Sequence, residues 1–100
     1  MHILIINFNL KNLTHDEYQS ICNDVANDFA SIPGLVSKKW LSNKKSNTYG
    51  GVYLWENKAS MDDYINSELY KSLKHNPCFD NIVTNDFEML PEPSKATRAI

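Results

Sequence analysis

The sequence is poor in the residues that build fibrous, disordered or disulfide-held chains. Its 100 residues include three glycines, four prolines and two cysteines, while 42% are apolar and 22% are charged. These proportions are typical of globular proteins that bury a hydrophobic core. The length is enough for one such core and leaves no room for a second domain. We therefore expect a single packed domain.

The motifs that hold common cofactors are also missing. The sequence has no CxxC or HExxH metal spacing, and no GxGxxG or GxxxxGK loop for a nucleotide or a flavin. No serine nucleophile motif supports hydrolysis. The formal charge of −2 leaves no excess of Lys and Arg, on which nucleic-acid binders depend. We expect no metal, no nucleotide cofactor and no nucleic-acid partner.

Long apolar runs and strongly basic segments are absent as well. The start of the sequence, Met1 to Asn7, lacks a basic region, and its apolar run is too short for a signal peptide or a membrane span. Cys22 and Cys78 have no disulfide-like spacing and suit a reducing compartment, so a cytoplasmic protein without membrane contact is expected. A lysine cluster near a predicted hairpin is interpreted as a solvated strand edge; it comprises Lys38, Lys39, Lys44 and Lys45.

Residues 2–8 predict a first strand that is apolar on both faces. Its residues fall on two parities, with Leu4, Ile6 and Phe8 on one and Ile3 and Ile5 on the other. A strand of this kind is buried on both sides. If the parity of Ile6, opposite Asn7, forms a subunit interface, an aspartate at Ile6 should dissociate the subunits.

The rest of the pattern predicts two helices and three more strands. Capping boxes at Thr14/Glu17 and Ser60/Asp63 start helices over residues 14–32 and 60–75. Strands are expected over residues 35–42, 49–55 and 79–90. The order is βαββαβ, an α+β ferredoxin-like fold with a four-stranded antiparallel sheet in domain 1–90 and a tail over 91–100. Two helices cover only one face, so a second subunit is expected on the other.

Three segments give the sequence a family likeness: Pro33-Gly34-Leu35, Lys39-Trp40 and the strand GGVYLW at Gly50–Trp55. From His2 to about Leu90 the chain resembles the YdhR-type monooxygenases of the dimeric α/β-barrel superfamily, which includes the antibiotic-biosynthesis monooxygenases. The resemblance implies a homodimer with sheets packed face to face, and a pocket between the helices and the sheet of each subunit. It also implies a cofactor-independent oxidation in which molecular oxygen is the co-substrate.

A more distant likeness suggests a second chemistry. The haem-degrading monooxygenases of the same superfamily use an asparagine on strand one, with a tryptophan and a histidine on helix two. Asn7, Tyr64 and His75 fall near these places, but the tryptophan has become Tyr64 and the histidine is displaced by one residue. On a helix one residue is roughly 100° of rotation, enough to turn a ligand away from the iron. Haem degradation is therefore kept as an alternative.

Asn7, Tyr64 and His75 are the candidate catalytic residues. Asn7 interrupts an apolar strand, where a buried amide needs hydrogen-bond partners. Tyr64 and His75 are eleven residues apart, so on one continuous helix they would share a face and a pocket. Imidazole titrates near neutrality, and either group could hydrogen-bond a phenolic oxygen. The alternatives are a structural amide at Asn7, core packing of Tyr64 and a helix-end role for His75.

Aromatic side chains supply the candidate substrate pocket. The expected substrate-binding residues are Phe29, Trp40, Tyr53 and Trp55, with core packing or a dimer interface as the alternative. The sequence thus predicts a cofactor-independent monooxygenase acting on a small hydroxylated aromatic or quinone-like compound. A non-catalytic, ligand-binding or stress-associated dimer is the other alternative.

Overall fold

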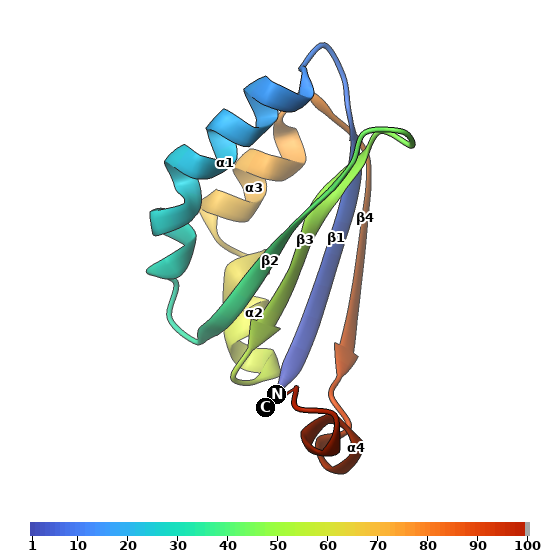
Figure 1. Cartoon of the computed structure of the whole chain (residues 1–100). Helices are drawn as coiled ribbons and strands as arrows, with labels where there is room; N and C mark the ends of the chain where they lie inside the picture. Colours follow the sequence, from blue (N-terminus) through green and yellow to red (C-terminus); the bar gives the residue numbers. More distant parts are fainter. Residues whose placement is uncertain (100) are drawn as a thin grey trace.

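The computed structural model describes residues 1–99, which form one antiparallel sheet with helices on one side (Figure 1). The strands lie in the order β2-β3-β1-β4. This is the expected α+β ferredoxin-like βαββαβ arrangement with a four-stranded antiparallel sheet. In chain order the elements are β1 (His2–Leu10), α1 (His15–Ala30), β2 (Leu35–Asn43), β3 (Thr48–Trp55), α2 (Lys58–Ile65), α3 (Glu68–His75), β4 (Phe79–Glu88) and α4 (Pro91–Ala96).

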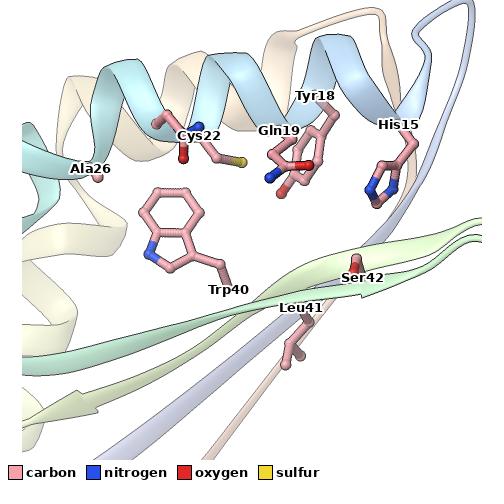
Figure 2. A pocket seen from close by; sticks show the side chains of 9 residues that line it. His15, Tyr18, Gln19, Cys22, Ala26, Trp40, Leu41 and Ser42 are labelled. Atoms are coloured by element: carbon pink, nitrogen blue, oxygen red, sulfur yellow. The ribbon is translucent and has the colours of Figure 1, made fainter.

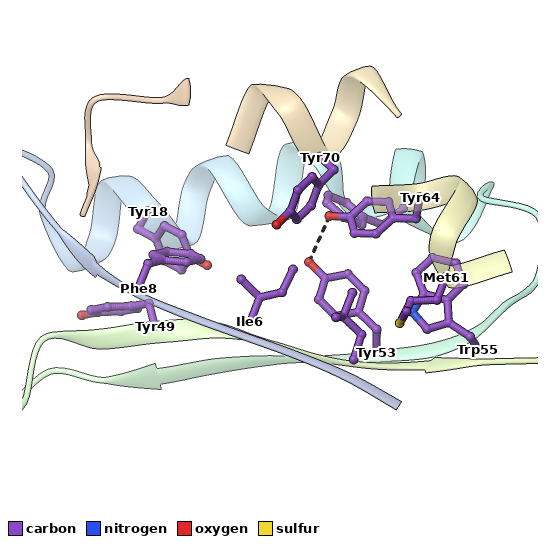
Figure 3. Packing of buried hydrophobic residues seen from close by; sticks show 11 residues of the cluster. Ile6, Phe8, Tyr18, Tyr49, Tyr53, Trp55, Met61, Tyr64 and Tyr70 are labelled. Carbon is purple, nitrogen blue, oxygen red and sulfur yellow. Dashed lines mark hydrogen bonds between the residues drawn. The ribbon is translucent and has the colours of Figure 1, made fainter. Parts of the chain in front are cut away.

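The core lies between the sheet and the helices α1, α2 and α3, and it is rich in aromatic rings (Figure 3). Leu4 and Ile6 of β1 are 0% exposed beneath these helices. The remaining buried apolar residues are Phe8, Tyr18, Phe29, Tyr49, Tyr53, Trp55, Met61, Tyr64 and Tyr70. Large rings therefore fill most of the space between the two layers, and each removes a large apolar area from water.

The opposite side of the sheet, which we call the open face, is not covered by any helix of residues 1–99 (Figure 1). Alternation places Ile3, Ile5 and Asn7 of β1 on this side, beside partners in β3 and β4. Val83 and Phe87 remain 54% and 52% exposed. The residues of the open face include Ile3, Ile5, Asn7, Lys39, Leu41, Val52, Leu54, Val83, Asn85 and Phe87.

The first helix begins as predicted, whereas the second differs. Thr14 caps α1 with a reciprocal hydrogen-bond pair to Glu17, which confirms that capping box. The cap of α2 is Asn57, whose side chain accepts a hydrogen bond from the Ser60 backbone N–H. Ser60 is thus inside the helix and does not begin it.

The predicted helix over residues 60–75 is two helices, because polar side chains interrupt it. The Asn66 amide donates to the Asp62 carbonyl oxygen, and the Ser67 hydroxyl donates to that of Tyr64. Ser67 also caps α3 by accepting from the Tyr70 N–H. Such local bonds compete with a continuous helix. The continuous-helix prediction was wrong at this point, and α2 and α3 have separate axes.

The end of the chain departs from the expected strand and tail. The strand β4 ends at Glu88, and Pro91 follows in the first turn of α4, a position that tolerates its missing N–H. The backbone N–H of Met89 donates to the Met1 carbonyl oxygen, which joins the segment after β4 to the start of β1. Within residues 1–99 no helix is long and apolar enough to cross a membrane.

Candidate functional site

A cleft lies between α1 and the strand β2 (Figure 2). Its volume is about 450 Å³, and its polar groups come mainly from α1. Trp40 rises from β2 toward α1, whereas the next residue, Leu41, points to the other side of the sheet. This alternation allows one strand to supply both the cleft and the open face. The cleft is lined by His15, Tyr18, Gln19, Cys22, Asn23, Ala26, Trp40, Leu41 and Ser42.

A deeper cavity of about 210 Å³ adjoins this cleft, because Tyr18, Cys22 and Trp40 line both. The helix α3 closes its far side with Leu69, Ser72 and Leu73. Its walls are mostly apolar and aromatic, as in sites that bind small organic molecules. The aromatic residues that line it are Phe8, Tyr18, Phe29, Trp40, Tyr53 and Phe79.

Lys38 places its ammonium group among these rings. Its Nζ lies 3.3 Å from the ring centre of Trp40, 3.6 Å from that of Phe29 and 4.6 Å from that of Tyr53. These distances are within the range of cation–π attraction. Lys38 and Trp40 share the helix-facing side of β2, where their partners in β3 are Tyr53 and Gly51. The interpretation of all four clustered lysines as a solvated edge was therefore wrong for Lys38.

Burial shifts the pKa values of Lys38 and of the titratable groups around it. It lowers the pKa of Lys38 to about 7, since an ammonium loses hydration there. Burial also raises the pKa values of the Cys22 thiol and of the Tyr18 and Tyr53 hydroxyls. These neighbours are therefore neutral at physiological pH and offer Lys38 no counter-charge.

The outer part of the cleft carries a second polar pair. The His15 Nδ1 atom lies 2.9 Å from the Tyr49 hydroxyl oxygen, within hydrogen-bond distance. His15 is in the first turn of α1, and Tyr49 is buried at the start of β3. His15 thus adds a polar group, held by this hydrogen bond, to the lining of the cleft.

Three of the four predicted substrate-binding residues line the deep cavity: Phe29, Trp40 and Tyr53. Trp55 is instead 0% exposed in the core, where its ring stacks on Tyr53 at an interplanar angle of 4°. Within residues 1–99 its Nε1 atom is buried without a hydrogen-bond partner.

The three candidate catalytic residues do not share a pocket. Tyr64 is buried beside the cavity, and its hydroxyl oxygen lies 3.3 Å from that of Tyr53 (Figure 3). Burial raises the pKa of Tyr64 to about 12. Asn7 is on the open face, where its amide donates to the Tyr49 carbonyl oxygen. His75 is exposed at the end of α3, and the break before Ser67 removes the shared helix face. The single-pocket prediction was wrong for these reasons.

The comparisons with known proteins identify the family. A profile of the family described as "Putative mono-oxygenase ydhR" matches residues 3–100. The chain belongs to the YdhR family. A comparison with curated protein sequences found no match.

Solved structures share the fold of this YdhR-family chain at low sequence identity. A variant of SnoaB, a cofactor-independent oxygenase from Streptomyces nogalater, is 18% identical over 91% of this chain and 97% of its own, with a TM-score of 0.69. A variant of MhuD with two manganese protoporphyrin IX molecules per active site is also 18% identical, over 92% and 97%, with a TM-score of 0.72. An antibiotic biosynthesis monooxygenase is 14% identical over 91% and 100%, with a TM-score of 0.71.

The β3 sequence GGVYLW bears directly on Lys38. A Cβ atom at Gly51 would lie 2.8 Å from Lys38 Cε and 3.2 Å from Tyr53 Cε1. Glycine at this position therefore leaves the space that the lysine side chain occupies. The shared parity of Lys38 and Trp40 was a signal in the sequence that could have predicted a buried lysine.

Replacing Lys38 with Met should stabilise the YdhR-family fold at neutral pH. The folded-state pKa of Lys38 is about 7 and its ordinary value is 10.5, so the charge destabilises the fold fully below about pH 7. That cost disappears as the pH rises toward 10.5. We expect Lys38→Met to gain about 1 kcal/mol near neutrality, as an apolar replacement of a buried charge can, and much less in alkali.

Urea unfolding at about pH 6.5 and about pH 9.5 measures this difference. Lys45→Met is the control, because Lys45 is an exposed lysine of the same cluster in the turn between β2 and β3. A gain for Lys38→Met that is equal at both pH values would contradict the assigned burial of the charge.

Proposed function

We propose that this protein is a cofactor-independent monooxygenase that oxidises a small hydroxylated aromatic compound in the deep cavity. The observation that carries the proposal is the wall formed by Phe29, Trp40 and Tyr53 within a cavity of about 210 Å³. Edge-to-face contact between Phe29 and Trp40, whose ring centres are 5.2 Å apart, gives that wall a fixed shape. Membership of the YdhR family and the fold shared with SnoaB support the proposal.

The reaction needs no reductant besides the substrate. A phenol loses its hydroxyl proton, and the electron-rich ring then reacts with molecular oxygen. One oxygen atom enters the ring as a carbonyl group and the other leaves as water, so a phenol and O₂ give a quinone and H₂O. All four electrons come from the ring. The protein's part is to hold the ring in one orientation, to exclude water and to favour loss of the proton.

We also propose that the protein is a homodimer with the two open faces in contact. The exposed apolar side chains of Val83 and Phe87, with Ile3 and Ile5 beside them, support this arrangement. Contiguous exposed apolar side chains are typical of interaction sites, and two such faces that meet remove them from water. The unpaired thiols of Cys22 and Cys78 support the further proposal of a cytoplasmic location.

Haem degradation is not the function that we propose. The residues behind that alternative were Asn7, Tyr64 and His75. Asn7 lies on the open face, while Tyr64 is buried in the core on the other side of the sheet and His75 is exposed. The geometry therefore gives the haem alternative no common pocket.

Oxygen uptake tests the proposed activity. Purified protein is mixed with a panel of phenols, hydroquinones and naphthols, and an oxygen electrode records uptake while absorbance records quinone formation. Trp40→Leu should lower uptake at least about tenfold, because removing a wall of the cavity frees the ring to misorient. Ligand binding with no protein-dependent uptake across the panel would favour the non-catalytic alternative and overturn the proposal.

A further inference from the structure

Lys38 is the charged group of the cavity, and its surroundings give it no carboxylate. Within residues 1–99 the ion pairs are His2 with Asp86, Lys58 with Asp62 and Lys71 with Glu68, and none includes Lys38. Its Nζ instead contacts the faces of aromatic rings. A buried ammonium is costly unless an opposite charge or hydrogen-bond acceptor meets it. The cavity therefore suits a ligand that brings such a group.

The other titratable groups near Lys38 are neutral at physiological pH, whichever element they come from. The helix α1 contributes the Tyr18 hydroxyl and the Cys22 thiol, and β3 contributes the Tyr53 hydroxyl. Tyr64 of α2 stands behind Tyr53, with its own pKa raised by burial. An anion that enters this cavity thus meets the Lys38 amino group, which can carry a proton, and no negative group among residues 1–99.

Two features show that the protein is shaped around this lysine. The first is Gly51, where a side chain would press on Lys38 Cε at 2.8 Å. The second is the set of three rings that surround Nζ, from α1, β2 and β3. A lysine on a solvated strand edge needs neither a missing side chain opposite it nor rings on three elements around it. The geometry thus places the ammonium at the cavity wall.

We propose that Lys38 selects ligands that carry an acidic aromatic hydroxyl and holds them as the phenolate. When Lys38 enters as the neutral amine, the hydroxyl proton moves from the ligand oxygen to Nζ, and an ammonium–phenolate pair results. When it enters as the ammonium, the phenolate binds directly. No oxidant or reductant takes part. The inference rests on the proposed function only in sharing its cavity, because it concerns binding and does not require turnover.

The test uses 4-nitrophenol, whose neutral and anionic forms absorb at different wavelengths, and its methyl ether 4-nitroanisole, which cannot ionise. At a pH where the free probe is mostly neutral, 4-nitrophenol bound to the parent protein should show the phenolate spectrum. Quenching of the fluorescence of the two tryptophans, of which Trp40 lines the cavity, gives the two affinities. A charge-assisted hydrogen bond predicts that Lys38→Met weakens 4-nitrophenol binding about ten- to a hundredfold and changes 4-nitroanisole binding less than about twofold.

Lys45→Met is the control, since Lys45 is an exposed lysine in the turn between β2 and β3 and its replacement should leave both affinities unchanged. A neutral spectrum for bound 4-nitrophenol, or an equal loss of both probes in Lys38→Met, would overturn the assignment. The spectrum of the parent protein answers the question even if a variant folds poorly. Phenolate binding without oxygen uptake would contradict the proposed function and support this inference. Oxygen uptake with a neutral bound probe would support the proposed function and contradict this inference.

Discussion

Aspartate at Ile6 is expected to unfold the protein, whereas aspartate at Ile5 is expected to leave it folded and to dissociate the dimer. Ile6 is 0% exposed beneath the helices, so an aspartate there would place a charge in the core without a partner. Such a change costs more than about 4 kcal/mol, which is most of the stability of a small domain. Ile5 is half-buried on the open face, between Val52 and Asn85.

Circular dichroism and sedimentation velocity separate these two outcomes. The Ile6→Asp variant should lack a cooperative thermal transition. The Ile5→Asp variant should keep that transition but sediment as a monomer at concentrations where the parent protein is a dimer. A folded, monomeric Ile6→Asp variant would show that the face of Ile6, and not that of Ile5, forms the interface. A dimeric Ile5→Asp variant would contradict the proposal that the open face forms the interface.

Alanine at Gly50 is expected to disrupt the sheet, while alanine at the adjacent Gly51 is expected to be tolerated. Gly50 has a φ of +148°, and a Cβ there would lie 1.8 Å from the Ile6 carbonyl oxygen. That oxygen belongs to the central strand and cannot move alone, and the dihedral itself disfavours a side chain. We expect Gly50→Ala to lose about 3–5 kcal/mol of stability or to fail to fold.

Gly51→Ala is the matched control for Gly50→Ala. Its Cβ would meet the Cε atom of Lys38 and an edge of Tyr53, and the lysine side chain is flexible enough to shift. The expected loss of stability is about 1 kcal/mol or less. Urea unfolding of both variants measures the difference. Equal losses would contradict the view that backbone overlap, and not general crowding of the strand, makes Gly50 essential.

The order of elements was predictable because each strand and the first helix are marked by residues within their own segments. Runs of apolar residues marked the strands, and the capping box at Thr14 marked the start of α1. The break between α2 and α3 was not predicted, since the hydroxyl of Ser67 and the amide of Asn66 can point to solvent or bond to the backbone. Their choice depends on how the helix packs and not on spacing alone.

The candidate site was predictable only in part, because β1 is apolar on both faces. Its alternation could not say whether Ile6 or Asn7 faces the helices, and the structure answers that Ile6 does. The rings of Phe29, Trp40 and Tyr53, which were predicted to bind the substrate, line one cavity, and their role in binding stays a prediction. Lys38 was missed because lysines on strands are usually solvated, and its burial depends on the space left by Gly51 in another strand.

The two faces of the sheet carry different sets of side chains, one toward the cavity and one toward the proposed subunit contact. Along β2, Lys38 and Trp40 face the cavity, while Lys39 and Leu41 face the open side. If the two proposals hold, a point substitution in β2 alters either ligand binding or the subunit contact, and not both. Inserting one residue before Lys38 would exchange both sets together, since strand side chains alternate with a period of two. Single substitutions in β2 therefore change one face at a time. A shift of its register by one residue would change both the proposed ligand-binding face and the proposed subunit contact.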